Sequence, residues 1–336
     1  MKINNMKILF RVSGGKAPAK QLGFGHAYRA IYLAQNFKKN SLFFLLEDYG
    51  GLKKLFLTNG FNKIYHIKKE TTLNNDIKKT LEIICKENID VLIIDKFNPS
   101  IRYIKNLRKF VKIVVISDLN KINFQSDLVF NGFVGFRNKI QYNKFDTKCF
   151  LGPSYQILDK NFSKKQQIKK KYKLLVTFGG LDENKITCKF LQALENHDPG
   201  FPIKIILGPG APKLNLQNTN FKSKITIVQE TKNMFKEISS TEFGLCSGGI
   251  TSYEFASQKV PFVIIPQVKH QVKTAKEWEK LGVARSLGFV NKLTHKKIEQ
   301  FLRLITSNPS AIYSKNSKIV DGLGAKRVAK EIMALK

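Results

Sequence analysis

Short apolar runs alternate along this chain with segments whose apolar positions recur at helical spacing. Ala27, Ala30, Ile31 and Ala34 stand at i, i+3, i+4 and i+7, which predicts one buried face of a helix. Strands that alternate with such helices are typical of a parallel sheet with crossover helices. The strands predicted in the first half are MKILFRV (6–12), SLFFLL (41–46), VLIID (91–95), KIVVIS (112–117) and DLVFN (127–131).

The alternation begins again after a charged stretch, SKKQQIKKKYK (163–173). Helical patterns at 294–306 and 317–335 close the chain. Each half therefore predicts its own doubly wound α/β domain. The strands predicted in the second half are KLLVTFGG (173–180), IKIILG (203–208), ITIV (225–228), FGLCS (243–247) and PFVIIP (261–266).

The predicted domain boundaries follow from these two strand sets. We expect an N-terminal Rossmann-like domain at 1–152, a linker at 153–172, a C-terminal Rossmann-like domain at 173–316 and a final helix at 317–336. A length of 336 residues with 43% hydrophobic content is enough to bury two cores.

Composition narrows the class of protein. No apolar run approaches the roughly 18 residues that span a bilayer, and MKINNMKILF lacks a secretory pattern, so we expect a cytoplasmic protein. The cysteines are too far apart in sequence for metal-ligand spacing, which favours inert core thiols over a disulfide framework or a zinc site. No metal or cofactor is expected. The four cysteines are Cys85, Cys149, Cys188 and Cys246.

The net charge of +33 attracts nucleic acid, anionic lipid or phosphorylated metabolites. Only eight of the 58 basic residues are arginine, the residue with which nucleic-acid readers usually contact bases, and no RNA-recognition, zinc-finger or homeodomain signature is present. We therefore expect no nucleic-acid partner. The charge indicates an anionic substrate or weak peripheral contact with an acidic membrane, and a genome-wide lysine bias explains it equally well.

Three glycine-bearing turns each precede a predicted helix: GFGH (23–26), FGG (178–180) and CSGG (246–249). Glycine lets the backbone approach a ligand, and a helix N-terminus favours phosphate. Any one of these turns can simply close a strand-to-helix connection, but three of them favour a diphosphate in a cleft between the two domains. The spacing is not the dinucleotide fingerprint, since His26 follows the second glycine and Arg29 takes the place of the third.

A carboxylate accompanies the last of these turns. Glu254 lies seven residues beyond Ser247, over one turn into the predicted helix, where it can accept hydrogen bonds from both hydroxyls of a ribose. An ordinary solvated helix glutamate is the alternative. Gln271 opens another predicted helix and can offer an amide to a sugar, or be a plain surface residue.

With these motifs the chain resembles the UDP-sugar hydrolases of the pseudaminic acid pathway, which cleave UDP from a 2,4-diacetamido-2,4,6-trideoxy sugar. It also resembles the related spore-coat polysaccharide proteins. The most specific matches are G-x-G-H-x-x-R at 23–29 and S-G-G-x-T-x-x-E at 247–254. The resemblance implies a GT-B fold, with two Rossmann-like domains facing a central cleft. Other matching segments are VLIIDKF, ISDLN with DLVFNGF, LGPSYQILDKNF, FGGLDENKITCKFLQAL and VDGLGAKRVAKEI.

The resemblance also implies roles for individual residues. His26 is the implied catalytic base, and Asp95, Phe97 and Asp118 are candidate sugar-pocket residues. Phe97 stands where these hydrolases commonly have a tyrosine, and the loop GGKAPAKQLGFGH (14–26) is longer than usual. The residues that should bind the substrate or its UDP are Gly23, Gly25, Arg29, Gly179, Gly180, Ser247, Gly248, Gly249, Thr251, Glu254 and Gln271.

These residue types suit an inverting, metal-independent reaction on a UDP-sugar. UDP leaves as a stable anion, so stabilising its charge with N–H groups and helix dipoles matters more than protonating it. The incoming water needs a base, which imidazole supplies. The expected reaction is hydrolysis to free sugar and UDP; in the alternative, a glycosyltransferase, His26 deprotonates an acceptor hydroxyl. A histidine at a helix start is otherwise often just a cap.

Overall fold

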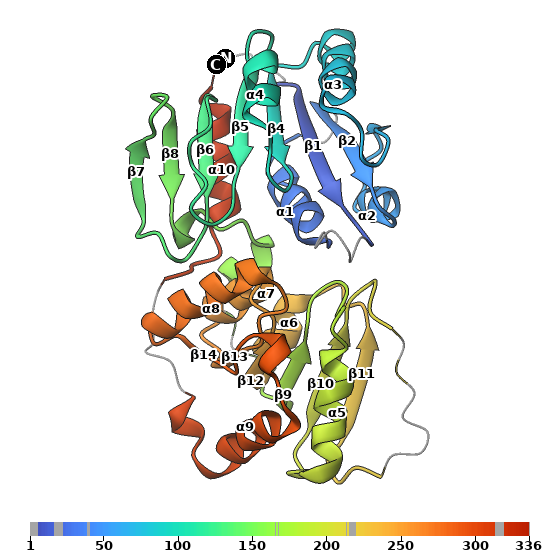
Figure 1. The fold of residues 1–336 in the computed structure, drawn as a ribbon, viewed down its shortest axis with the longest axis vertical. Coiled ribbons are helices and arrows are strands. Elements are labelled where there is room, and N and C mark those ends of the chain that lie inside the picture. Colours follow the sequence, from blue (N-terminus) through green and yellow to red (C-terminus); the bar gives the residue numbers. More distant parts are fainter. Residues whose placement is uncertain are drawn as a thin grey trace. The chain divides into compact units, whose positions relative to one another are not determined.

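The computed structural model describes residues 6–16, 23–38, 41–164, 166, 168–212, 214, 220–312 and 319–335. The chain divides into two compact units (Figure 1). Unit 1 comprises Met1–Lys160 with Gly322–Lys336, and unit 2 comprises Asn161–Asp321. The segment predicted as a linker at 153–172 is thus shared between the units, and the final helix belongs to unit 1.

Unit 1 is built on an eight-stranded sheet with the order β3-β2-β1-β4-β5-β6-β8-β7. The pairs are parallel except for β7 with β8. The strand order reverses between β1 and β4, and in open α/β sheets ligands bind beyond the carboxyl ends of the strands at such a point. The strands are β1 Ile8–Gly14, β2 Leu42–Asp48, β3 Ile64–His66, β4 Val91–Asp95, β5 Lys112–Ile116, β6 Leu128–Asn131, β7 Lys139–Tyr142 and β8 Lys148–Leu151.

The first helix of unit 1 buries the face that the sequence predicts. Ala27, Ala30, Ile31 and Ala34 are all buried in α1 (Gly25–Ala34), and α10 (Gly324–Met333) packs against α1. A Cβ on Gly324 would lie 2.0 Å from the carbonyl oxygen of Gln156, so only glycine lets α10 begin this close to the chain. The other helices of unit 1 are α2 Leu52–Thr58, α3 Leu73–Glu87 and α4 Ile101–Leu107.

A cluster of charged side chains is buried around Arg11 of β1. The buried Arg11 donates from Nε and Nη2 to the two carboxylate oxygens of Asp76, both at 2.9 Å, and from Nη2 to Glu47 at 3.1 Å. Lys96 Nζ also donates to Asp76, at 3.0 Å. Burial by itself would raise the pKa of Asp76, but Arg11 and Lys96 hold it below its ordinary value. The cluster ties β1, β2 and the end of β4 to α3.

We expect Asp76→Asn to lower the free energy of unfolding by about 3–5 kcal/mol, because it leaves the buried Arg11 without its main counter-charge. A folded-state pKa below the unfolded value adds stability above about pH 4 and loses it as the pH falls through the folded value, so the difference from wild type should shrink in acid. Urea unfolding across pH measures this.

Glu82→Gln is the matched control for Asp76→Asn. Glu82 pairs with Lys79 at 3.0 Å on the exposed side of α3, where an ion pair contributes at most about 1 kcal/mol. Equal losses in the two variants, or a loss in Asp76→Asn that is independent of pH, would show that the Arg11 cluster does not stabilise unit 1 as described.

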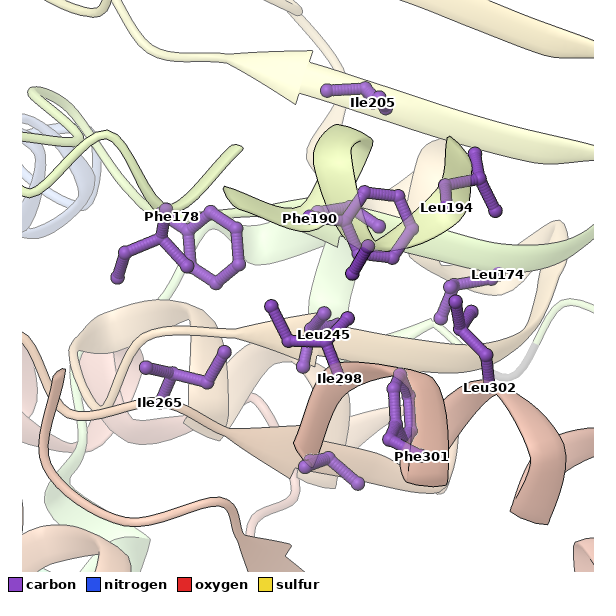
Figure 2. Packing of buried hydrophobic residues seen from close by; sticks show 14 of the residues in the cluster. Leu174, Phe178, Phe190, Leu194, Ile205, Leu245, Ile265, Ile298, Phe301 and Leu302 are labelled. Carbon is purple, nitrogen blue, oxygen red and sulfur yellow. The ribbon is translucent and has the colours of Figure 1, made fainter. Parts of the chain in front are cut away.

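Unit 2 is a parallel sheet of six strands in the order β11-β10-β9-β12-β13-β14. Figure 2 shows its core, in which Phe190 and Leu194 of α5 and Phe301 and Leu302 of α9 pack with residues of the sheet such as Leu245. The strands are β9 Tyr172–Thr177, β10 Ile203–Leu207, β11 Ile225–Gln229, β12 Thr241–Cys246, β13 Phe262–Ile264 and β14 Ala284–Ser286. The helices are α5 Ile186–Asn196, α6 Met234–Ser239, α7 Ile250–Ser257, α8 Lys269–Lys280 and α9 His295–Ser307.

All ten predicted strands are present, and β3, β7, β8 and β14 are additional. The predicted helix at 317–335 begins only at Gly324, and residues 317 and 318 lie outside the described part of the chain. Among the described residues, no helix combines the length and the hydropathy that crossing a membrane requires.

The expectation of four core thiols is correct for two cysteines. Cys149 and Cys246 are buried, whereas Cys188 is half-buried and Cys85 is exposed. Cys85 directly follows the buried Ile84 on α3, and one residue further along a helix turns the side chain by about 100°, here toward solvent. All four are free thiols.

Candidate active site

His26 lies in the first turn of α1, close to the carboxyl end of β1. The loop that leads to it returns to the strand, since Gly15 N donates to Gly23 O at 3.1 Å. Gly25 is the first residue of α1, so the predicted GFGH turn does open a helix. Residues 17–22 of the long loop predicted at 14–26 lie outside the described residues.

A carboxylate determines which nitrogen of His26 carries its proton. His26 Nδ1 lies 2.7 Å from Oδ1 of Asp95, the fully buried last residue of β4. Burial would raise the pKa of Asp95, but the charge and hydrogen bonds of Arg29, followed by the hydrogen bond from His26, hold it below its ordinary value. An ionised carboxylate only accepts, so Nδ1 carries the hydrogen and the lone pair of the neutral ring is on Nε2.

Arg29 lies one turn after His26 on α1 and binds two carboxylates. Its Nε and Nη2 donate to both oxygens of Asp95, at 2.8 and 2.6 Å, while Nη1 donates to Asp118 at 2.6 Å and Nη2 to Asp118 at 3.2 Å. Nη2 is also 3.1 Å from His26 Nδ1. Nη2 has two hydrogens and donates both to carboxylates, so it has none left to donate to Nδ1 of His26.

These contacts place two of the candidate site residues inside a buried network. Arg29, expected to bind the substrate or its UDP, has only 9% of its side chain exposed and is held by Asp95 and Asp118. Asp95, expected in the sugar pocket, has no exposed surface, and its oxygens accept from His26 and Arg29. The i, i+3 spacing of His26 and Arg29 places both side chains on one helix face, and this is the sequence feature that indicates their shared contact with Asp95.

The other two candidate sugar residues lie at the surface of unit 1. Asp118 follows β5 and has half of its side chain exposed, although it binds Arg29. Phe97 follows β4, is 45% exposed, and has Lys121 Nζ 5.5 Å from its ring centroid. Because β4 and β5 are neighbouring parallel strands, both residues lie at the same edge of the sheet as His26.

Two of the predicted glycine turns lie side by side in unit 2. β9 and β12 are neighbours that pair Thr177 with Cys246, and the turns follow directly. Gly179 has a left-handed φ of 79°, and a Cβ on it would lie 3.6 Å from Ser247 Oγ. Gly180 continues the first of these turns, so the FGG and CSGG segments meet at the carboxyl edge of the sheet.

The CSGG turn leads into α7 as the sequence predicts. Gly249 is the N-cap residue, Thr251 lies in the first turn, and Glu254 lies over one turn in and is buried. Burial and the nearby charge of Glu254 together raise the pKa of Cys246, so this carboxylate lies close to the end of β12. The alternative of a solvated surface glutamate is therefore wrong for Glu254.

Gln271 packs directly on this turn from α8. A Cβ on Gly248 would lie 3.0 Å from the Cβ of Gln271, so any larger residue here would push Gln271 away from the turn. Gln271 Oε1 accepts a hydrogen bond from Gln267 N at 2.9 Å, and Gln267 Nε2 donates to Phe178 O at 2.7 Å. Gln267 thus links both glycine turns. The one sequence feature that indicates a role for it is its position directly after the predicted strand PFVIIP.

The structure therefore assembles each half of the predicted site within its own unit. His26, Arg29, Asp95 and Asp118 form one network, and Gly179, Ser247, Gly248 and Gln271 form the other. Ligand binding by these residues, by Gly23 and Gly25, and in a cleft shared by the units stays a prediction.

Comparison with known proteins agrees with this architecture. Residues 154–332 match the glycosyltransferase family 28 C-terminal domain. The uncharacterised protein MJ1062 of Methanocaldococcus jannaschii is 30% identical over 268 residues, 74% of this chain, and the chain spans only 54% of that protein's length. The spore coat polysaccharide biosynthesis protein SpsG of Bacillus subtilis is 26% identical over 91% of this chain and 93% of its own length.

A third relative matches a smaller part of this chain. The Helicobacter pylori pseudaminic acid cytidylyltransferase and UDP-2,4-diacetamido-2,4,6-trideoxy-beta-L-altropyranose hydrolase is 28% identical over 41% of this chain and 25% of its own length.

Solved structures show the same fold at low sequence identity. MurG of Acinetobacter baumannii superposes with a TM-score of 0.67 at 15% identity, covering 98% of this chain and all of that one. Anabaena Alr3699/HepE in complex with UDP and glucose reaches 0.56 at 14% identity, with the same coverage. The fold is therefore GT-B, built from two Rossmann-like units.

Proposed function

The chain belongs to the family of the glycosyltransferase family 28 C-terminal domain, and from this premise we propose that it hydrolyses a UDP-activated diacetamido-trideoxy sugar. The products are the free sugar and UDP, and the reaction serves the synthesis of a pseudaminic-type nonulosonic acid. The chain is a GT-B enzyme of the glycosyltransferase-like superfamily. The name of the pseudaminic acid relative supports the sugar class, that of the spore-coat relative supports a role in polysaccharide synthesis, and the UDP in the Anabaena complex supports the nucleotide.

The contact between His26 and Asp95 is the observation that carries this proposal. With Nδ1 donating to Asp95, Nε2 of His26 accepts a proton from water while the water oxygen attacks the anomeric carbon. The bond from that carbon to the diphosphate oxygen breaks, UDP leaves with the electron pair, and the anomeric configuration inverts. Asp95 then stabilises the imidazolium that forms, as the carboxylate of a catalytic triad does.

The glycine turns of unit 2 suit the leaving group. The backbone N–H groups at the start of α7 and the positive end of its dipole favour a diphosphate, and they stabilise its charge as the bond breaks. We propose that Gly179, Gly180, Ser247, Gly248, Gly249 and Thr251 bind the diphosphate, that Glu254 binds the ribose, and that Gln271 contacts the sugar.

The direct test is to incubate the protein with a panel of UDP-sugars and to follow UDP release. Hydrolysis predicts release at a steady rate in buffer, with an inverted free sugar in the first NMR spectra. A panel that includes the diacetamido-trideoxy sugar and UDP-N-acetylglucosamine separates the proposed substrate from a common one. Absence of UDP release from every member, with and without added acceptors, would refute the proposal.

The family match favours a second candidate, a glycosyltransferase that moves an amino sugar to a glycan or lipid-linked acceptor. The same base then removes a proton from an acceptor hydroxyl. UDP release that is slow in buffer and rises when an acceptor is added would favour this reaction. Weak contact with an acidic membrane through the +33 charge and a cytoplasmic location stay predictions.

We expect Glu254→Ala to weaken UDP binding by roughly tenfold or more while the fold is unchanged. A hydrogen bond to a charged group contributes about 1.5–3 kcal/mol, and a tenfold change in the dissociation constant corresponds to about 1.4 kcal/mol. Isothermal calorimetry with UDP measures the change, and Glu277→Ala on α8 is the control, since Glu277 pairs with Lys280. A dissociation constant equal to that of wild type would remove Glu254 from the site.

A further inference from the structure

The turn that carries Asp118 has a backbone conformation that its sequence does not favour. Leu119 has a φ of 53°, in the left-handed region, and residues 117–121 contain no glycine. A residue with a Cβ pays roughly 1–2 kcal/mol for this conformation, so other contacts must hold it. Such strain is found where the surrounding structure fixes a functional side chain.

Asn131 supplies those contacts from the end of β6. It is fully buried, and its Nδ2 donates to Leu119 O at 2.7 Å and to Ser117 Oγ at 3.0 Å, with Lys121 O at 3.4 Å. Its Oδ1 accepts from Phe133 N at 3.0 Å. Ser117 Oγ in turn donates to Lys121 O, so one buried amide closes the whole turn.

Asp118 stands between the two residues that Asn131 holds. Its side chain is half exposed, and an ion pair at such a position contributes little unless its geometry is fixed by the backbone. The turn provides this fixation and directs Asp118 to Arg29, at 2.6 Å. Arg29 then contacts Asp95, and Asp95 contacts His26, so a continuous series of polar contacts leads from Asn131 to the ring.

We propose that Asn131 is a positioning residue for the His26 site. It holds the left-handed turn at Leu119 that aims Asp118 at Arg29, and Arg29, clamped between two carboxylates, orients Asp95 toward Nδ1 of His26. This inference rests on the proposed function, in which that ring removes the proton from water. The effect belongs to unit 1, so it acts on the chemical step and not on the UDP site of unit 2.

Asn131→Ala is expected to lower kcat by roughly 10- to 100-fold, the scale of an ångström-level misplacement of reacting groups. The dissociation constant of UDP should stay unchanged. Asn143→Ala is the matched control: Asn143 also donates to two carbonyls, of Ile122 and Phe124, at 2.6 and 3.0 Å, and accepts from two backbone N–H groups. The Asn143→Ala variant should lose about as much stability as Asn131→Ala but keep its turnover.

Leu119→Gly separates the turn conformation from general stability. Glycine populates the left-handed region without a steric cost, so Leu119→Gly removes the strain that Asn131 otherwise has to overcome. In the Asn131→Ala background it should restore part of the lost kcat, because the turn then spends more time in the required conformation. A double variant no faster than Asn131→Ala would contradict the role of the turn.

A ring signal of His26 tests the inference independently of turnover. In protein labelled with 15N-histidine, the Nδ1–H proton should be protected in the wild type and in Asn143→Ala, and should exchange faster in Asn131→Ala. Absence of UDP release by the wild type would refute the proposed function, while this signal would still test the positioning role. Equal losses of turnover and protection in Asn131→Ala and Asn143→Ala, or none in either, would overturn it.

Ser117→Ala provides a milder change if Asn131→Ala does not fold. It removes one acceptor of Asn131 and the donor to Lys121 while the amide stays in place. A smaller fall in kcat in the same direction, with protection of the His26 ring proton reduced, is expected; wild-type values for both would contradict the proposal.

Discussion

Replacing His26 with asparagine is expected to lower turnover by at least about 100-fold while UDP binding stays nearly intact. Asparagine is close in size and can still meet Asp95, but it has no lone pair of suitable basicity to accept a proton from water. The proposed UDP site lies in unit 2, far along the chain from the missing imidazole, so the loss should fall on kcat. Steady-state UDP release and calorimetry with UDP measure the two quantities.

His66→Asn is the control for this variant. His66 is the last residue of β3, the edge strand of the unit 1 sheet two strands away from β1, and it is exposed. It should behave as the wild type. Turnover in His26→Asn equal to that of the wild type would refute the assignment of the base, and a parallel loss of UDP binding would show that His26 serves binding instead.

Asp95→Asn is expected to have an effect of similar size, a fall in kcat of about 100-fold or more, without removing the base itself. An amide can offer an N–H to Nδ1 of His26, which moves the ring proton to Nε2 and leaves no lone pair toward the substrate. Arg29 also loses one of its two counter-charges in a buried position, so the free energy of unfolding should fall.

A control variant and a double variant test the role of Asp95. Asp127→Asn is the control, since Asp127 accepts from Ile113 N at 2.7 Å at the amino edge of the same sheet and should affect stability alone. In the double variant His26→Asn with Asp95→Asn, turnover should be close to that of His26→Asn, because the two residues act as one unit. Fully additive losses would contradict the proposed pair.

Much of the fold could be predicted because strand and helix patterns are local. VLIID is buried at all five positions of β4, and the alanine face of α1 lies where its spacing places it. β7, by contrast, has no apolar run: KIQY is an exposed strand, and its position is set by antiparallel pairing with β8. Such a pairing depends on a partner and leaves no periodic signal in the strand itself.

The candidate site was harder to predict, because its contacts join distant parts of the chain. Asp95 is visibly the last residue of a strand, yet its partners His26 and Arg29 precede it by 69 and 66 residues. Arg11 stands inside an apolar run and meets Asp76 only across 65 residues. The sequence shows which groups are available at the carboxyl ends of strands, but the register between elements decides which of them face each other.

The path of the chain has a consequence for the order in which the protein matures during synthesis. The helix that bears His26 and Arg29 packs against α10, and all of unit 2 is made between these two helices. In a nascent chain, the side of α1 that packs against α10 therefore stays uncovered until residues 324–333 have left the ribosome. Unit 2 can reach its final state first, whereas the helix that bears His26 acquires this neighbour only after all of unit 2 has been translated.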